Sequence, residues 1–143
     1  MSDIKEACFE TLRMGQTFTT SNVVSEEDII KFSEVTGDVN PIHLDEDYAR
    51  ESIFGERIAH GMIAAGYISA IFGTHFPGPG SIYLSQSLKF RAPVKIGDRV
   101  DTTVTIVDRN EKRKRVRLNC ECKVGDIVVL TGDAQLMVPS AQN

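Results

Sequence analysis

The sequence predicts an α+β fold in which an antiparallel sheet of about five strands wraps around one buried central helix. Apolar residues recur at helical spacing in the first half of the chain, whereas they alternate with polar residues in the second half. Between the two halves, residues 60–76 are apolar or small on nearly every side. This pattern is typical of a buried helix, because the segment is too short to span a membrane.

The first half of the chain predicts two helices joined by a loop. Ser25 is followed by three acidic residues, which is typical of a capping box, and apolar residues continue at helical spacing as far as Val35. Asp45 is placed to cap a second, shorter helix that ends before Gly55. The residues between these two helices, 36–44, are expected to form a loop.

The central helix carries two interior glycines, Gly66 and Gly73. Glycine inside a helix costs about 1 kcal/mol relative to alanine, so each of these positions needs a physical reason. We expect a strand or a ligand to approach the helix closely at both glycines.

The second half of the chain predicts strands separated by tight turns. Residues 82–90 alternate between apolar and polar side chains. The dry face of this strand is expected to carry Ile82, Leu84, Leu88 and Phe90. Gln86 is a polar exception on the dry face, and we expect its amide to bond the central helix or its start; a substrate contact is the weaker alternative.

Four more strands complete the predicted sheet. They are expected at Gln16–Val24, through Val100–Ile106, through Val116–Val124, and in a last segment ending near Val138. Only the central helix is long enough to cover the dry face of such a sheet, and a sheet curled around a helix is the hot-dog architecture. Because one helix rarely covers the edges as well, we expect a two-fold dimer that extends the sheet.

Length and composition limit the classes of protein. The 143 residues are expected to form a single domain, 1–143, with one core, and the formal net charge of −4 gives no general attraction to nucleic acid. The N-terminus has acids where a signal or transit peptide needs bases, and no apolar run suits a membrane span. We therefore expect a cytoplasmic protein that binds no membrane, with a processed organellar form left open. The three cysteines, without a C-x-x-C pair, predict packing roles.

The loop between the first two helices places an acid, an amide and an imidazole close together. Gly37 and Pro41 fix the turns around Asp38 and His43, so both side chains can point to one place. A carboxylate and an imidazole held together in this way can act as an acid–base pair, in which one group takes a proton and the other delivers one. Asn40 either orients this loop through its amide or only forms the turn.

The stretch FSEVTGDVNPIHLDEDYA resembles the signature of the MaoC-like, R-specific enoyl-CoA hydratases, the hydratase 2 group. The resemblance continues through IAHGMIAAGYIS and FPGPGSIYLSQSLKFRAPVKIGD, so it covers residues 32–98 well and the last strands more loosely. It implies a homodimeric lyase without a cofactor, since coenzyme A is part of the substrate. It also implies that Asp38 and His43 hold one water, which adds to short- or medium-chain trans-2-enoyl-CoA to give (R)-3-hydroxyacyl-CoA.

Gly61 opens the central helix, where N–H groups lack helical acceptors and the helix dipole is positive. A thioester oxyanion would be stabilised there, and the resemblance implies this role for the Gly61 amide. The resemblance also places Ser69 near the site, although a serine on a buried helix often bonds its own i−4 carbonyl. His60 suggests a metal site with Asp38 and His43, but no second ligand pair supports one, and no metal is expected.

Several alternatives remain open at this point. The basic run Lys112–Arg117 is typical of solvated charge at the start of a strand, although it could also meet coenzyme A phosphates or an acidic carrier protein. A thioesterase of the same fold, a 3-hydroxyacyl-carrier-protein dehydratase and a non-catalytic acyl-thioester-binding module are the competing functions. The presence of both Asp38 and His43 favours an enzyme, because a protein that had lost the activity would not need to keep both residues.

Overall fold

The computed structural model describes residues 4–141, and the predicted fold class is confirmed. Its elements in chain order are η1 (Phe9–Thr11), β1 (Thr17–Val23), α1 (Glu26–Thr36), α2 (Pro41–Leu44), α3 (Glu46–Arg50), α4 (Gly61–Ala70), the π turn η2 (Ile71–His75), β2 (Ile82–Phe90), β3 (Arg99–Asn110), β4 (Arg115–Val124) and β5 (Ile127–Met137). No helix within residues 4–141 is long and apolar enough to cross a membrane.

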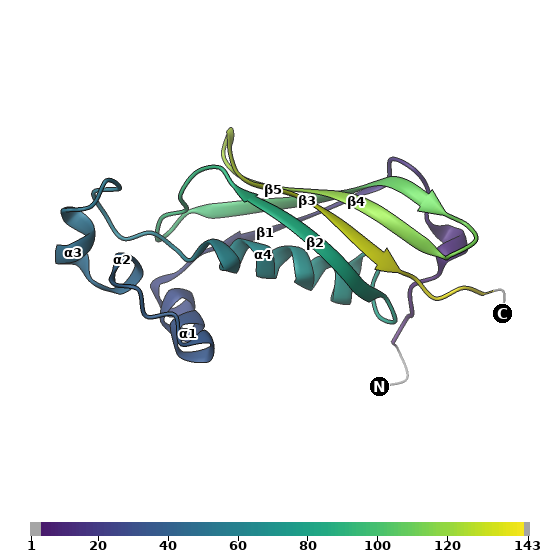
Figure 1. Cartoon of the computed structure of the whole chain (residues 1–143), viewed down its shortest axis with the longest axis horizontal. Coiled ribbons are helices and arrows are strands. Elements are labelled where there is room, and N and C mark those ends of the chain that lie inside the picture. Colours follow the sequence, from purple (N-terminus) through teal and green to yellow (C-terminus); the bar gives the residue numbers. More distant parts are fainter. Residues whose placement is uncertain (1–3, 142–143) are drawn as a thin grey trace.

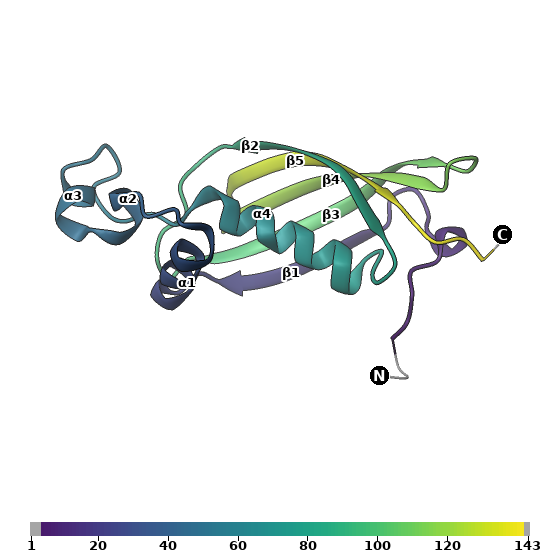
Figure 2. The ribbon, with the colours of Figure 1, turned by 60° about the horizontal axis from the view of Figure 1, so that its bottom comes forward.

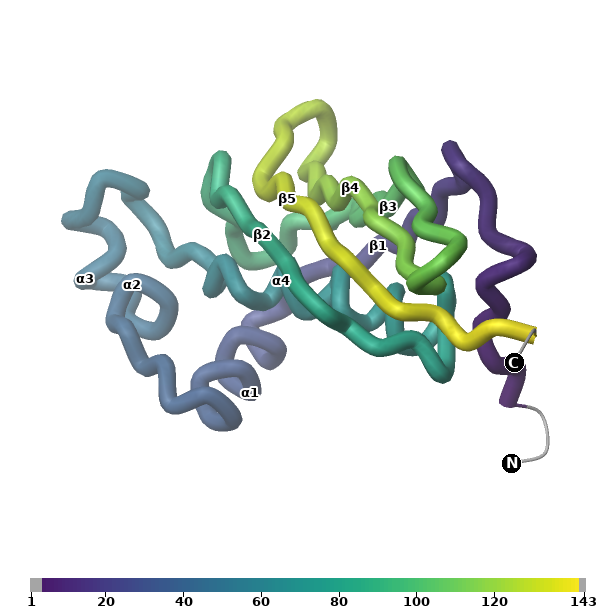
Figure 3. Tube along the Cα trace, turned by 45° about the vertical axis from the view of Figure 1, so that its right-hand side comes forward, coloured from purple at the N-terminus to yellow at the C-terminus, as the bar shows by residue number. Residues whose placement is uncertain are grey.

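The five strands form one antiparallel sheet in the order β1-β3-β4-β5-β2. Helix α4 runs along one face of this sheet, and α1, α2 and α3 extend beyond the sheet at the end where α4 begins (Figures 1 and 2). The described parts of both chain ends lie at the opposite end (Figure 3). The start of α4 therefore meets the short helices, and that junction is where the loop residues of interest gather.

The core lies between α4 with its following turn and the sheet. Ile68, Ile71 and Phe72 point into it and are at most 1% exposed, as are Val104 and Leu118 from the sheet. Burying each large aliphatic or aromatic side chain contributes about 1.5–3 kcal/mol, so this layer holds the helix against the strands. Cys120 and Cys122 are also buried here as free thiols, in agreement with the packing role predicted for them.

Helix α4 is less buried than its sequence predicts. Met62 is 51% exposed, and Gly66, Ser69 and Gly73 are also exposed on the side facing away from the sheet. The close approach expected at the two glycines is absent among residues 4–141, because a Cβ atom at either glycine would meet nothing within 4 Å. A single chain thus leaves one face of an apolar helix uncovered.

Strand β2 also departs from the predicted alternation. Its register with β5 shifts between Tyr83 and Ser85, which marks a bulge, and Tyr83 pairs with the buried Leu136. Tyr83 therefore packs edge-on against Phe72 in the core, while Ile82 is 51% exposed. The prediction that Ile82 shares a dry face with the later apolar residues is wrong, because one inserted residue moves the side chains before it to the other face.

The predicted helices are confirmed with one addition. Ser25 and Asp28 form a reciprocal capping box at α1, and the Asp45 carboxylate accepts the Tyr48 N–H to cap α3. The segment expected to be a plain loop contains a one-turn helix, α2, which starts at Pro41. Proline suits the first position of a helix, since its missing N–H is not needed there.

Candidate active site

Two tight turns place the loop that follows α1. Gly37 ends α1 with a left-handed φ of 78°, and its N–H bonds the Ser33 carbonyl. Three residues later, the Asn40 side chain accepts the Ile42 N–H at 3.1 Å and caps α2. The Asp38 carboxylate accepts the Asn40 N–H at 3.2 Å. The bond from the Ile42 N–H is the turn-forming role that the sequence allowed for Asn40, and an orienting role toward a catalytic side chain stays a prediction.

His43 projects from α2 and is only 8% exposed. Its Nδ1 lies 2.7 Å from the main-chain carbonyl oxygen of Ile58, so Nδ1 carries the proton and Nε2 is the free acceptor in the neutral ring. Burial lowers the pKa of His43 below its usual value, and the neighbouring His60 lowers it further, while the Ile58 bond and the Asp38 charge oppose the shift. The ring is thus kept as a neutral base.

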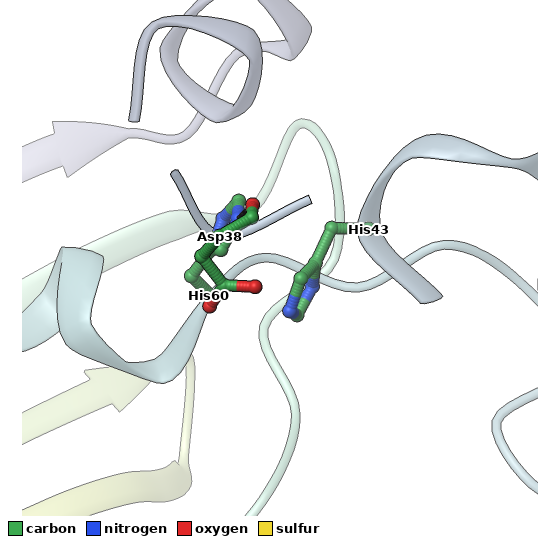
Figure 4. Close-up of side chains that lie close together, drawn as sticks. All are labelled: Asp38, His43 and His60. Carbon is green, nitrogen blue, oxygen red and sulfur yellow. Dashed lines mark hydrogen bonds between the residues drawn. The ribbon is translucent and has the colours of Figure 1, made fainter. Parts of the chain in front are cut away.

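Asp38, His43 and His60 come together in space. Their carboxylate and ring ligand atoms lie within 4.8 Å of one another, and Figure 4 shows the three side chains gathered around one small space. Two hydrogen bonds of about 2.8 Å that meet near the tetrahedral angle span about 4.6 Å. The Asp38 carboxylate and the His43 ring therefore lie within the span of one bridging water molecule.

His60 lies beneath this pair and is 3% exposed. Its Nε2 is 3.0 Å from the Ser33 hydroxyl and 3.1 Å from the main-chain oxygen of Asp38. Its ring stacks on the His43 ring with centroids 3.9 Å apart, and it also contacts Phe32. These contacts connect α1, the loop, α2 and the start of α4.

Gly61 is the first residue of α4, directly after His60. Its N–H lies at the positive end of the helix and has no intrahelical acceptor. A Cβ atom here would lie 2.7 Å from the Phe90 ring, so the packing of β2 against the helix start requires glycine or a shift of that ring. The absence of a side chain at Gly61 therefore lets the Phe90 ring pack against the start of α4.

An apolar cavity of about 500 Å³ lies beside His43, His60 and Gly61. Most of its walls are apolar side chains from the start of α4, the segment before it and the ends of the neighbouring strands. Arg91 is the one permanently charged side chain among its lining residues. Asp38 does not line it and is exposed, so the carboxylate stands at the outer edge of the site.

Ser69 and Gln86 are not brought to this site within one chain. Ser69 is exposed and lies eight residues along α4 from Gly61, which is about 12 Å at the rise of an α-helix. Gln86 accepts the Tyr83 hydroxyl hydrogen bond and donates to the Ser87 carbonyl and, at 3.8 Å, to the Cys120 sulfur on β4, so its amide is used within the sheet. The bond to the helix expected for Gln86 is absent among residues 4–141, and the site roles of both residues stay predictions.

Arg57 is a residue that the sequence did not single out. It is 9% exposed, its Nε donates to the main-chain oxygen of His43 at 2.8 Å, and its guanidinium pairs with Glu26 at 2.8 Å. Arg57 thus fixes the backbone of α2 to α1. No local pattern in the sequence marks this arginine, because its partners lie 14 and 31 residues away.

The basic run 112–117 lies at the other end of the molecule. The turn joining β3 to β4 is at the end of the sheet remote from α2 (Figures 1 and 2). Lys114 pairs with Glu10 and Glu111, and Arg117 pairs with Asp133. Within one chain Lys114 and Arg117 therefore form local ion pairs, and the whole run lies away from the site.

The three grouped ligand atoms raise the possibility of a metal site. Nδ1 of His43 is occupied by the Ile58 carbonyl, and Nε2 of His60 is occupied by Ser33 and the Asp38 carbonyl. Two stacked rings also direct their nitrogen lone pairs along their own planes, which does not suit one shared tetrahedral ion. The expectation of a metal-free site stays a prediction.

Comparisons with known proteins agree with this geometry. A family model described as a MaoC like domain matches residues 9–125. The chain is 47% identical to a 3-hydroxybutyryl-CoA dehydratase of Methylorubrum extorquens, over 99% of this chain and 90% of the relative. It is 48% identical to an (R)-specific enoyl-CoA hydratase of Rhodospirillum rubrum, over 92% of each. The solved R-hydratase PhaJ1 from Pseudomonas aeruginosa superposes with a TM-score of 0.89 at 38% identity, covering 94% of this chain and 87% of that one.

Proposed function

Because the chain belongs to the MaoC-like dehydratase family, we propose that it is an R-specific enoyl-CoA hydratase, a lyase that reversibly adds water to trans-2-enoyl-CoA. The observation that carries the proposal is the placement of the Asp38 carboxylate and the His43 ring within 4.8 Å of each other, with His43 lining an apolar cavity. A single domain, residues 1–143, would perform this reaction without a cofactor.

In the proposed mechanism His43 moves the proton and Asp38 orients the water. The free Nε2 of His43 removes one proton from water as the oxygen bonds to the β-carbon of the enoyl thioester. The electrons of the double bond then reside on the thioester oxygen as an enolate. The His43 imidazolium returns its proton to the α-carbon on the same face, so that hydration is a syn addition and the ring becomes neutral again. The Asp38 carboxylate stays ionised and stabilises the imidazolium.

The Gly61 amide would stabilise the enolate oxygen. A backbone N–H at the start of α4 is preorganised and lies beside His60 at the mouth of the cavity. Loss of one such donor in other enzymes costs about 10²–10³ in rate. The apolar cavity would hold the acyl chain. The name of the relative from M. extorquens, a 3-hydroxybutyryl-CoA dehydratase, supports a short chain as substrate.

We also propose that the working form is a homodimer. The uncovered face of α4 and the free edge strand β2, with its exposed Ile82, Leu84 and Phe90, are apolar surfaces that a second copy would bury. Light scattering coupled to size exclusion should give twice the 15.8 kDa of one chain. A mass of one chain at micromolar concentration would contradict this part of the proposal.

The decisive test follows the absorbance of crotonyl-CoA with purified protein. The reaction is coupled separately to R- and S-specific 3-hydroxyacyl-CoA dehydrogenases and to a free-thiol reagent. We expect loss of conjugation with R product and no thiol. Thiol release would instead establish a thioesterase, and S product would overturn the stereochemical assignment. Activity on a crotonyl-carrier protein with none on crotonyl-CoA would identify the carrier-bound dehydratase.

A further inference from the structure

We propose that His60 is a positioning residue of this active site, which holds the main-chain carbonyl of Asp38 and supports the ring of His43. The inference rests on the proposed function, since it concerns the geometry around the same water. His60 does not touch that water in the scheme above; it acts through the two residues that do.

The hydrogen bonds of His60 select one tautomer. A carbonyl oxygen only accepts, so the 3.1 Å contact with the Asp38 carbonyl requires the proton on Nε2. Nδ1 is buried and has no hydrogen-bond partner among residues 4–141. A protonated Nδ1 would leave an N–H unsatisfied and a charge buried, both of which are costly. His60 is therefore the neutral Nε2–H form, with a lone pair on Nδ1.

The hydrogen-bond partners of His60 explain why a histidine occupies this position. His60 is the N-cap residue of α4, but its side chain makes no capping hydrogen bond. It reaches Ser33 on α1 instead and passes directly behind Asp38. One rigid ring thus ties the start of the helix that presents Gly61 to the loop that presents the carboxylate. A displacement of about 1 Å in such a group can cost about 100-fold in rate.

The stacking of His60 on His43 also affects how readily His43 is protonated. The two rings are 3.9 Å apart, so the neutral His60 ring covers one face of His43 and adds to the burial that lowers the pKa of His43. The charged groups near His43 are Asp38, which favours its protonated form, and Arg57, which bonds its carbonyl and is neutralised by Glu26. His60 is therefore the neighbour whose replacement should make His43 easier to protonate.

Four variants in the full-length enzyme test the proposal. His60→Leu removes the hydrogen bonds and the ring, whereas His60→Gln keeps an amide N–H where Nε2 was. Ser33→Ala removes only the hydroxyl partner. The matched control is His75→Gln, because His75 is an exposed histidine at the far end of the same helical segment. Each variant is assayed for R-product formation across pH, and the His43 titration is followed by NMR.

We expect His60→Leu to lower kcat about 100-fold with a much smaller change in KM, since His60 forms only a small part of the wall of the acyl cavity. His60→Gln should recover most of that loss, yet it should shift the acid limb of the rate profile and the His43 titration to higher pH. Ser33→Ala should fall between wild type and His60→Leu. His75→Gln should match wild type throughout.

Two results for His60→Gln would overturn the proposal, both with a His43 titration unchanged from wild type. In the first, kcat also equals that of wild type. In the second, the variant is as inactive as His60→Leu. If His60→Leu fails to fold, His60→Gln and Ser33→Ala decide by the same criteria. Inactivity of the wild-type enzyme on all thioesters would instead refute the proposed function, and the NMR titration of His43 would still report on the His60 contact.

Discussion

Replacement of Asp38 by asparagine separates catalysis from folding in this molecule. The carboxylate is exposed, and its hydrogen bond among residues 4–141 is the 3.2 Å bond accepted from the Asn40 N–H. The amide oxygen of Asp38→Asn can accept the same bond. A substitution of this kind usually changes stability by no more than about 0.5 kcal/mol, so the unfolding temperature should stay within a few degrees of wild type.

The rate should nevertheless fall steeply. An amide neither orients water as strongly as a carboxylate nor stabilises the adjacent imidazolium. Proton transfer by His43 depends on both effects, and acid–base catalysis of this kind contributes about 10²–10⁴ in rate. That range corresponds to about 2.7–5.4 kcal/mol of barrier. The assay is the initial rate of crotonyl-CoA hydration, with thermal unfolding and light scattering on the same sample. A folded Asp38→Asn enzyme with more than about a third of the wild-type kcat would refute the assigned role.

Three further predictions concern the surroundings of the site. Arg57→Leu should lower the free energy of unfolding by about 1–3 kcal/mol in urea titrations, because the His43 carbonyl and Glu26 lose their buried donor. The control is Arg50→Leu, which removes only an exposed ion pair with Asp47. Equal stability of the two variants would contradict the argument. Burial lowers the pKa of His43 below 6.5, so between the lowered value and 6.5 the unfolded state binds more protons than the folded state. The contribution of His43 to stability is therefore complete above pH 6.5 and is lost as the pH falls through the lowered pKa. His43→Gln should flatten this dependence in urea titrations at successive pH values, and an unchanged slope would count against it. Prolonged treatment with EDTA, with metal content measured, should leave the rate unchanged; a loss restored by one divalent ion would establish a metal site.

The predictions from sequence succeeded where a feature depends on neighbouring residues. The capping box at Ser25, the cap at Asp45 and the turns around Gly37 are local hydrogen-bonding patterns, so their residue types suffice to place them. The two periodicities likewise predicted the helix α4 and the strands of the sheet. The motif around Asp38 and His43 also predicted that these side chains meet, because Pro41 and the one-turn helix leave few other arrangements.

The same reasoning failed where an extra residue or a missing neighbour changes the outcome. Periodicity assumes an unbroken strand, and the bulge in β2 therefore reversed the face predicted for Ile82. The all-round apolar pattern of α4 predicted burial, yet Met62 is exposed in one chain. The hydropathy of a segment predicts that its apolar surface is buried, but it does not identify the chain or molecule that buries it.

The sequence by itself determined the fold class, the N-terminal caps of α1 and α3 and the acid–imidazole pair, because each depends on patterns within short stretches of the chain. Only the tertiary structure decided that His60 stacks on His43 and that Arg57 holds the His43 carbonyl. These relations join residues that are distant in sequence, and their geometry follows from how the helices pack on the sheet, which no local pattern of side chains specifies.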